Sequence, residues 1–290
     1  MTARLNVGVV GAGRVGAVLG ASLRAAEHTV IGASGRSADS ASRIDTLLPD
    51  VPHLHPAEFA ADADLVLLTV PDDAIADVAG ELVDCWRPGQ LVMHASGRFG
   101  VGVLESASSR GALPLAIHPA MTFTGTSLDT IRMRDAIFAV TAAATVIPVA
   151  QALVAEFGGT AVEVAEGDRA KYHAALAHAA NHAVALNAQA MEVLAQIGID
   201  HPGRVLDPLV KASLEGAWRD GADSAASLTG PVVRGDVGTL RAHLAALSGN
   251  PEIAESYAAA AIATARVARA RGRLSAEEYA EVMSAVEKDV

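Results

Sequence analysis

The sequence predicts an α/β fold in which a doubly wound parallel sheet is followed by an all-helical domain. The first half alternates short valine-rich runs with segments of helical spacing, as parallel strands joined by crossover helices do. A glycine-rich turn follows the first run and opens a helix. After Gly167 only helical periodicity remains, so we expect a sheet domain over residues 1–166 and a helical domain over residues 167–290.

In the sheet domain we expect seven strands and three main helices. The strands are Leu5–Val10, Thr29–Gly32, Asp64–Val70, Leu91–His94, Leu115–His118, Ala136–Val140 and Thr160–Val164, and the helices are Arg14–Ala26, Pro71–Asp84 and Pro148–Phe157. In the helical domain we expect Arg169–Ile197, Arg204–Trp218, Val237–Leu247, Pro251–Arg271 and Ala276–Lys288, the last capped by Ser275.

Composition narrows the class of protein. A formal net charge of −11 disfavours nucleic acid and anionic membrane surfaces as partners. The single cysteine, Cys85, excludes an intrachain disulfide, and no leader-like segment precedes the first strand, so we expect a cytoplasmic protein. Two uncharged stretches, at 136–155 and 172–191, raise the question of a membrane span. We interpret the first as a strand and a helix, and the second as a helix buried inside the protein.

The strongest motif is the glycine-rich turn after the first strand, which predicts a dinucleotide site. The first glycine allows a tight turn, the second lets a pyrophosphate approach the backbone, and the third lets the helix pack on the strand. The amino end of the helix then offers N–H groups and a positive dipole to the phosphates. The motif consists of Gly11, Ala12, Gly13, Arg14, Val15 and Gly16.

The end of the second strand favours NADP over NAD. An NAD site expects an acidic residue there to hold the ribose 2′-hydroxyl, but no acid lies between Glu27 and Asp39. Arg36 can instead pair with a 2′-phosphate, and Ser34 and Ser37 can hydrogen-bond to it. We therefore expect NADP(H) as the cofactor.

Ligands of such sheets bind beyond the carboxyl ends of the strands, where three further segments fall. Val70 and Pro71 are expected to shape the cofactor wall. Ser96 can bind the carboxamide or orient a substrate, and His94 and His118 can contact substrate and exchange protons near neutral pH.

The order of an NADP-binding domain and an all-helical domain resembles the 6-phosphogluconate dehydrogenase-like superfamily. This superfamily includes ketopantoate reductases, β-hydroxyacid dehydrogenases, pyrroline-5-carboxylate reductases and prephenate dehydrogenases. The chain is most similar to Rossmann-like proteins with a C-terminal domain of unknown function 2520. Four segments carry that resemblance: HASG at 94–97, HPAMTF at 118–123, KYHAALAHAAN at 171–181 and SLTGPVVRGD at 227–236.

The resemblance implies a catalytic lysine early in the interdomain helix, at Lys171. The relatives carry an asparagine one turn later, where this chain has Ala175. Asn181 lies about 15 Å further along the helix and is not a one-turn substitute, although it remains a candidate for substrate binding. A partly desolvated lysine can donate a proton to a developing alkoxide or amine, so either Lys171 or His118 can be the acid.

Two further features belong to the helical domain. Thr229 and Arg234 lie in an irregular segment between helices, where Arg234 can clamp a substrate carboxylate. His178 and His182 have i, i+4 spacing but no third ligand, so we expect no metal there.

Together these features predict an NADP-dependent oxidoreductase that transfers hydride between the nicotinamide and a small keto or imino acid in the interdomain cleft. We also expect a homodimer through the helical domain. Two alternatives remain: a non-catalytic NADP-binding sensor, and a helical interaction protein that keeps a relict Rossmann domain. The substrate, the direction of the reaction and a deazaflavin as hydride partner stay open.

Overall fold

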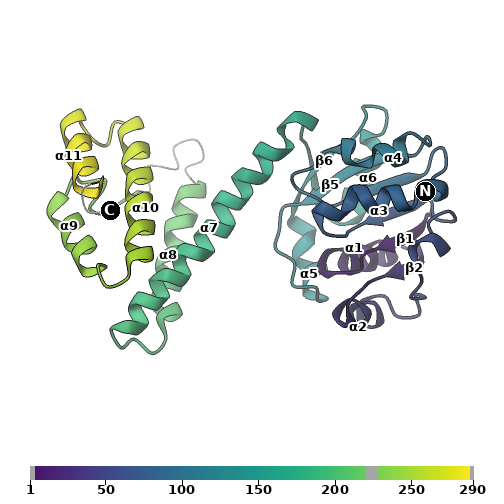
Figure 1. Cartoon of the computed structure of the whole chain (residues 1–290), viewed down its shortest axis with the longest axis horizontal. Coiled ribbons are helices and arrows are strands. Elements are labelled where there is room, and N and C mark those ends of the chain that lie inside the picture. The colour runs from purple at the N-terminus through teal and green to yellow at the C-terminus, as the bar shows by residue number, and fades with distance from the viewer. Residues whose placement is uncertain (1–3, 220–227, 288–290) are drawn as a thin grey trace. The chain divides into compact units, whose positions relative to one another are not determined.

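The computed structural model describes residues 4–219 and 228–287 (Figure 1). Two compact units divide the chain between His178 and Ala179. This division falls inside α7 (Arg169–Gln196), later than the boundary expected at Glu166. Ser227 and Lys288, which belong to predicted segments, lie outside the described residues.

The first unit is built on a seven-stranded sheet with the order β2-β1-β3-β4-β5-β6-β7. All neighbouring pairs are parallel except β5 and β6. The chain therefore reverses its direction of winding between β1 and β3, where this fold class binds ligands at the carboxyl ends of the strands. The strands are β1 (Asn6–Val10), β2 (Thr29–Ser34), β3 (Leu65–Leu68), β4 (Leu91–His94), β5 (Leu113–Pro119), β6 (Ile137–Thr141) and β7 (Thr160–Glu163).

The antiparallel pairing of β5 with β6 departs from the parallel sheet that we expected. Ile117 pairs with Val140 and Pro119 with Phe138. A parallel pair needs a crossover that carries the chain back to the end of the sheet where the first strand began. The connector after β5 instead forms the short α5 (Leu128–Arg132), which packs against α1 (Arg14–Ala25). As a result, β6 begins at the end of the sheet where β5 stops.

Helices cover both faces of the sheet, because alternate strand residues point to opposite sides. Val9, Leu67 and Met93 pack with α1, α2 (Ala38–Leu47) and α6 (Ile147–Glu156). Val66 and Val92 pack on the other face with α3 (Ile75–Glu81) and α4 (Glu105–Ser108). This arrangement confirms the doubly wound α/β fold.

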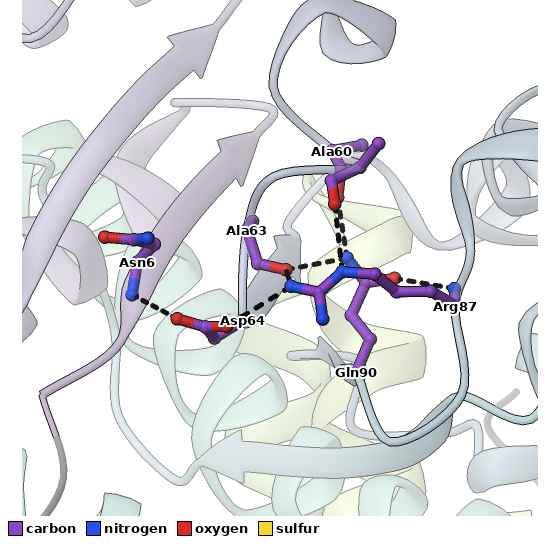
Figure 2. A network of polar contacts seen from close by, with 7 residues as sticks. Asn6, Ala60, Ala63, Asp64, Arg87 and Gln90 are labelled. Carbon is purple, nitrogen blue, oxygen red and sulfur yellow. Dashed lines mark hydrogen bonds and ion pairs between the residues drawn. The ribbon is translucent and has the colours of Figure 1, made fainter.

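A polar network ties together the amino edge of the sheet (Figure 2). Arg87 donates to the carbonyl of Ala63 at 2.8 Å and lies 3.2 Å from Asp64 Oδ1. Asp64 Oδ2 accepts from the backbone N–H of Asn6 at 2.9 Å, and buried Gln90 donates to the carbonyls of Ala60 and Ala63. These side chains bond to one another and to backbone, so they fix the strands at the edge opposite the glycine-rich turn.

The second unit is helical, and three of its helices build its core. Leu240, Ala261 and Val282 are buried contributors from α9 (Val237–Ala246), α10 (Pro251–Ala270) and α11 (Ala276–Glu287). Ser275 caps α11 as predicted: its hydroxyl accepts from Glu278 N–H, while the Glu278 carboxylate accepts from Ser275 N–H. The remaining helices are α7 and α8 (Pro202–Arg219).

The helix that we expected to be buried, α7, has Arg169 as its only buried residue. Among the described residues of α8 none is buried. None of the described helices is long and apolar enough to cross a bilayer. The two uncharged stretches therefore form β6 with α6 and most of α7.

Candidate functional site

The glycine-rich turn has the geometry that a dinucleotide needs. Gly11 has φ +90°, and a Cβ on Gly16 would lie 2.1 Å from the Thr69 hydroxyl oxygen, so neither position accepts a side chain. Around Gly13, by contrast, the nearest atom to such a Cβ is 4.0 Å away. The turn is thus closed where the helix packs and open at its second glycine, which is where a pyrophosphate approaches in this motif.

The amino end of α1 has N–H donors of the kind that bind phosphate in this motif. Gly13 caps the helix without a side-chain hydrogen bond, and the first turn contains no acidic residue. The first N–H groups of an α-helix have no partner within the helix. The positive end of α1, which starts at Arg14, is therefore free of the carboxylate that elsewhere neutralises such an end.

The carboxyl end of β2 lies directly beside this turn. The Ser34 carbonyl accepts from the N–H groups of Gly11 and Ala12, at 3.1 and 2.7 Å. The Ser37 hydroxyl caps α2 by accepting from Ser40 N–H at 3.1 Å. Arg36 lies between them, is exposed, and forms no hydrogen bond or ion pair with the other described residues. Of the three side chains predicted to hold a 2′-phosphate, Arg36 is the uncommitted one.

A threonine-rich loop from the β5–β6 connector packs against the same helix end. Gly125, with φ +80°, is so close that an added Cβ would lie 2.7 Å from Arg43 Nε and 3.0 Å from Arg14 Cγ. The loop is held by Asp129, which is fully buried and accepts from the N–H groups of Thr124 and Gly125, each at 2.7 Å. Burial raises the pKa of Asp129, but these hydrogen bonds outweigh it and leave the pKa below its ordinary value.

Side chains from the ends of β3 and β4 meet along the sheet edge. Ser96 is buried, and its hydroxyl donates to Asp72 at 2.7 Å. Asp72 also lies 3.3 Å from Arg98 Nε, so an arginine balances its charge. Val70 adjoins Gly11, and Pro71 follows it as an exposed residue; their place in a cofactor wall stays a prediction.

His94 is completely buried and is held as the neutral Nε2–H tautomer. Its Nδ1 accepts from Ser96 N–H at 3.1 Å, so Nε2 carries the proton and donates to the Gly100 carbonyl at 2.9 Å. Burial, with help from the charge of Arg169, lowers the pKa of His94 to about 4. Both ring nitrogens are used inside the protein, so His94 positions the loop that contains Ser96.

His118, at the end of β5, meets the start of α7. Its Nδ1 lies 3.0 Å from the hydroxyl of Tyr172, and its ring has edge contacts with Tyr172 and His173. A Cβ on Gly97 would lie 3.0 Å from His118 Nε2 and 2.5 Å from the His173 ring, so only glycine fits there. Burial, followed by the charge of Arg169, lowers the pKa of His118 to about 4. At neutral pH the ring is uncharged.

Arg169 lies beneath these groups and is 1% exposed. Its guanidinium donates to the carbonyls of Ser96 at 2.9 Å, Phe99 at 2.8 Å and Ala139 at 3.2 Å. These bonds fasten the first turn of α7 to the loop after β4 and to β6. Tyr172 follows three residues later on the same side of the helix, with its ring centroid 6.0 Å from Arg169 Cζ and its hydroxyl beside His118.

Comparison with known proteins agrees with this geometry. Residues 1–119 match the Rossmann-like domain family, and residues 136–264 match the family described as Domain of unknown function (DUF2520). The two matched segments follow one another along the chain, the Rossmann-like segment first and the DUF2520 segment second. These two matches confirm the resemblance to Rossmann-like proteins with a C-terminal domain of unknown function 2520. A comparison with proteins of curated function finds no match.

Solved structures share the fold at low sequence identity. A Bacteroides fragilis protein assigned as an NADP oxidoreductase has a TM-score of 0.75 at 18% identity, over 90% of this chain and 98% of the other. A Thermotoga maritima protein has a TM-score of 0.65 at 24% identity, over 91% and 99%. A reductive aminase from Aspergillus terreus, in complex with NADPH and ethyl-5-oxohexanoate, has a TM-score of 0.59 at 17% identity, over 99% and 93%.

The DUF2520 segment carries the other residues predicted for the site. The Lys171 side chain is 87% exposed and lies 3.8 Å from Asp168. At about 100° per residue, it points away from the face that Arg169 and His173 share. Asn181, Thr229 and Arg234 are exposed residues of the second unit. Their roles in substrate binding, and that of Lys171 as an acid, stay predictions.

Arg169, Tyr172 and Asp72 are the members of this cluster that sequence reasoning missed. Arg169 and Tyr172 had one usable signal, their spacing of three residues at the start of a helix that follows a domain boundary. Asp72 had none beyond its place after a predicted strand. The glycine-rich turn, Ser96 and His118 are brought to the same edge of the sheet, as predicted from their positions at strand ends.

Proposed function

We propose that the protein is an NADP-dependent oxidoreductase that transfers hydride between the nicotinamide and a small keto or imino acid. One observation carries this proposal. The glycine-rich turn after β1 and the pair formed by His118 and Tyr172 both lie where the parallel strands of one sheet end. Within that pair, His118 Nδ1 is 3.0 Å from the Tyr172 hydroxyl. A dinucleotide site and a proton-transfer pair are the two parts that a reductase needs.

The residues present fit the adenosine and phosphate half of a dinucleotide. Gly13 leaves space for the pyrophosphate, and the uncapped amino end of α1 supplies N–H donors. Arg36 would pair with a 2′-phosphate, and the Ser34 hydroxyl lies beside it at the end of β2. When bound, NADPH would supply the hydride. The solved reductive aminase complex with NADPH shows that a protein of this fold holds that cofactor.

His118 and Tyr172 would supply the proton that the reduced substrate takes up. Burial raises the pKa of the Tyr172 hydroxyl, and the Arg169 charge opposes that rise, so the phenol is protonated at neutral pH. With Nδ1–H of neutral His118 donating to the phenol oxygen, the phenol can donate its own proton to a substrate. Lys171 is the other candidate acid, because a substrate could approach the first turns of α7 from its side.

The test is NADPH oxidation over a panel of small keto and imino acids. We expect Tyr172→Phe and His118→Gln to lower kcat by about 10²–10⁴, the usual contribution of an acid, and to leave NADPH affinity unchanged. Tyr257→Phe is a matched control, because its hydroxyl lies 2.8 Å from His243 Nδ1 in a similar edge contact within the second unit. Wild-type kcat in both site variants, with a collapse in Lys171→Met, would assign the acid to Lys171.

A sensor that binds NADPH without turnover is the second candidate. It is favoured by Ala175, which occupies the position where related dehydrogenases are expected to carry an asparagine. Tight NADPH binding together with no oxidation on any member of the panel would replace the enzyme by this sensor.

A further inference from the structure

The charge of Arg169 has no carboxylate partner within ion-pair distance among the described residues. Its three hydrogen-bond acceptors are neutral carbonyls, and the side chain is shielded from water. A guanidinium stays protonated in proteins, although burial lowers the pKa of Arg169. In a medium of low polarity such a charge acts over a longer range than it would in water. The candidate site therefore contains a buried positive charge beneath His118 and Tyr172.

The groups near this charge offset it only in part, because burial still lowers the pKa of Arg169. His94 and His118 are neutral at physiological pH, and Tyr172, with its ring centroid 6.0 Å from Arg169 Cζ, is protonated. His173, the remaining titratable neighbour of His118 on α7, carries no negative charge. Asp72 is the acidic side chain on the β3 side, and it is held by the Ser96 hydroxyl and Arg98. The charge of Glu166 acts on Arg169 and raises its pKa, but the carboxylate is bound to the N–H groups of Val101 and Gly102 and forms no ion pair with the guanidinium.

We propose that Arg169 is a positioning residue whose buried charge selects substrates on which negative charge develops, namely carbonyl compounds, over protonated imines. This rests on the proposed function and chooses between the two substrate classes left open there. The guanidinium does not need to touch the substrate: it fastens the helical turn that carries Tyr172 and adds a positive potential at the His118–Tyr172 pair.

The chemistry of the two substrate classes differs in sign. Reduction of a carbonyl forms a C–H bond with hydride from the nicotinamide reductant, and the electron pair of the broken C=O π bond moves to oxygen. The oxygen takes the proton of the Tyr172 hydroxyl, and solvent returns that proton to the phenolate. Negative charge thus develops beside Arg169, where a fixed positive charge stabilises it. An iminium ion brings a positive charge to the same place and loses it on reduction, so the charge of Arg169 opposes its binding.

The experiment compares a small 2-keto acid with a cyclic imine of similar size, at a pH where the imine is protonated. We expect the kcat/KM of the wild-type protein to be at least about tenfold higher for the keto acid than for the imine, because one favourable charge contributes about that much. Arg169→Met should lower kcat for the keto acid by about 10–100-fold and shrink the preference, with NADPH affinity unchanged. Arg169→Lys keeps the charge and should retain the preference for the keto acid. Arg110→Met is the control, because Arg110 is exposed near the amino end of β5; it should match the wild type in kcat and in substrate preference.

A binding measurement decides the proposal even when no substrate is turned over. Oxalate and pyrrolidinium serve as the anionic and cationic probes, and each is titrated into the NADPH complex while cofactor fluorescence is recorded. Binding of oxalate in preference to pyrrolidinium, lost in Arg169→Met, supports the proposal. Pyrrolidinium binding as tightly as oxalate, binding of neither, or a wild-type preference for the imine overturns it. If oxalate binds but NADPH is not oxidised with any substrate, the proposed oxidoreductase activity is refuted, while the proposed role of Arg169 in selecting ligands by charge still holds.

Discussion

At the scale of single residues, Arg36 should decide between the two nicotinamide cofactors. Arg36→Glu removes the one uncommitted cation at the end of β2 and places an acid there, as in an NAD site. The loss of a charge-assisted phosphate pair costs about 1.5–3 kcal/mol, so NADPH affinity should fall about tenfold to a hundredfold while NADH affinity stays level or rises. Fluorescence titration with both cofactors measures this.

The control for that titration is Arg110→Glu, because Arg110 is exposed near the amino end of β5 and pairs there with Asp84. It should leave both affinities unchanged. Equal affinity of the wild-type protein for NADPH and NADH would contradict the assignment of NADP.

His94 and His118 should make the stability of the fold depend on pH. Both have pKa values lowered from 6.5 to about 4, so the unfolded chain binds more protons than the folded one between these values. Stability is then complete above pH 6.5 and falls as the pH drops toward 4. Between pH 6.5 and 5.5 each histidine should remove about 1 kcal/mol from the free energy of unfolding.

Urea unfolding at the two pH values tests this expectation. The wild-type difference should be about 2 kcal/mol from the two histidines, and His94→Gln should reduce it to about 1 kcal/mol, whatever the variant costs in absolute stability. A free energy of unfolding that is the same at both pH values would show that neither ring is held neutral.

At the scale of elements, the sequence pattern predicted most strands and long helices but missed the short connectors. Strands such as β3 are continuous apolar runs, and α11 carries a capping box, so both have local signals. In α2 Ile44 is the only buried residue, so its periodicity is weak. The antiparallel β6 follows from where α5 packs, a tertiary contact that no local pattern contains.

The candidate site was predictable to the same extent. The glycine-rich turn and His118 follow strands, and the rule that ligands bind at strand ends finds them. Arg169 is different, because an arginine in a first helical turn is usually solvated. Only its three carbonyl partners, which come from segments far apart in the sequence, show that it is buried.

The threonine-rich loop before α5 should depend on Asp129. Asp129→Asn replaces a carboxylate that faces two N–H groups with an amide that matches them less well, at a cost of about 1–3 kcal/mol in the free energy of unfolding. NADPH affinity should also fall, because Gly125 packs this loop against Arg14. Urea unfolding and cofactor titration measure the two effects, and Asp135→Asn, an exposed acid in the same connector, is the control. Unchanged affinity would show that the loop serves the fold alone.

At the scale of the whole molecule, apolar side chains on α7 and α8 are exposed in the part of the chain that the structure describes. Val184 is 71% exposed and Leu209 is 63% exposed, and the core of the second unit is made by α9, α10 and α11. Several exposed apolar side chains of this size on one helical unit are typical of an interface. A second copy of the chain is the partner that we predict, because two-fold pairing lets the same apolar face cover itself.

We therefore expect the wild-type chain to elute with twice its own mass when light scattering follows size-exclusion chromatography. Leu209→Asp and Val184→Asp place a charge where the partner should pack, so each should shift the protein toward the single-chain mass. Val267→Asp is the matched control: Val267 is 45% exposed on α10, outside the α7–α8 face, and its replacement should leave the dimer intact. A wild-type protein that elutes with the mass of a single chain would contradict the predicted dimer. Equal effects of all three variants would place the interface elsewhere than on α7 and α8.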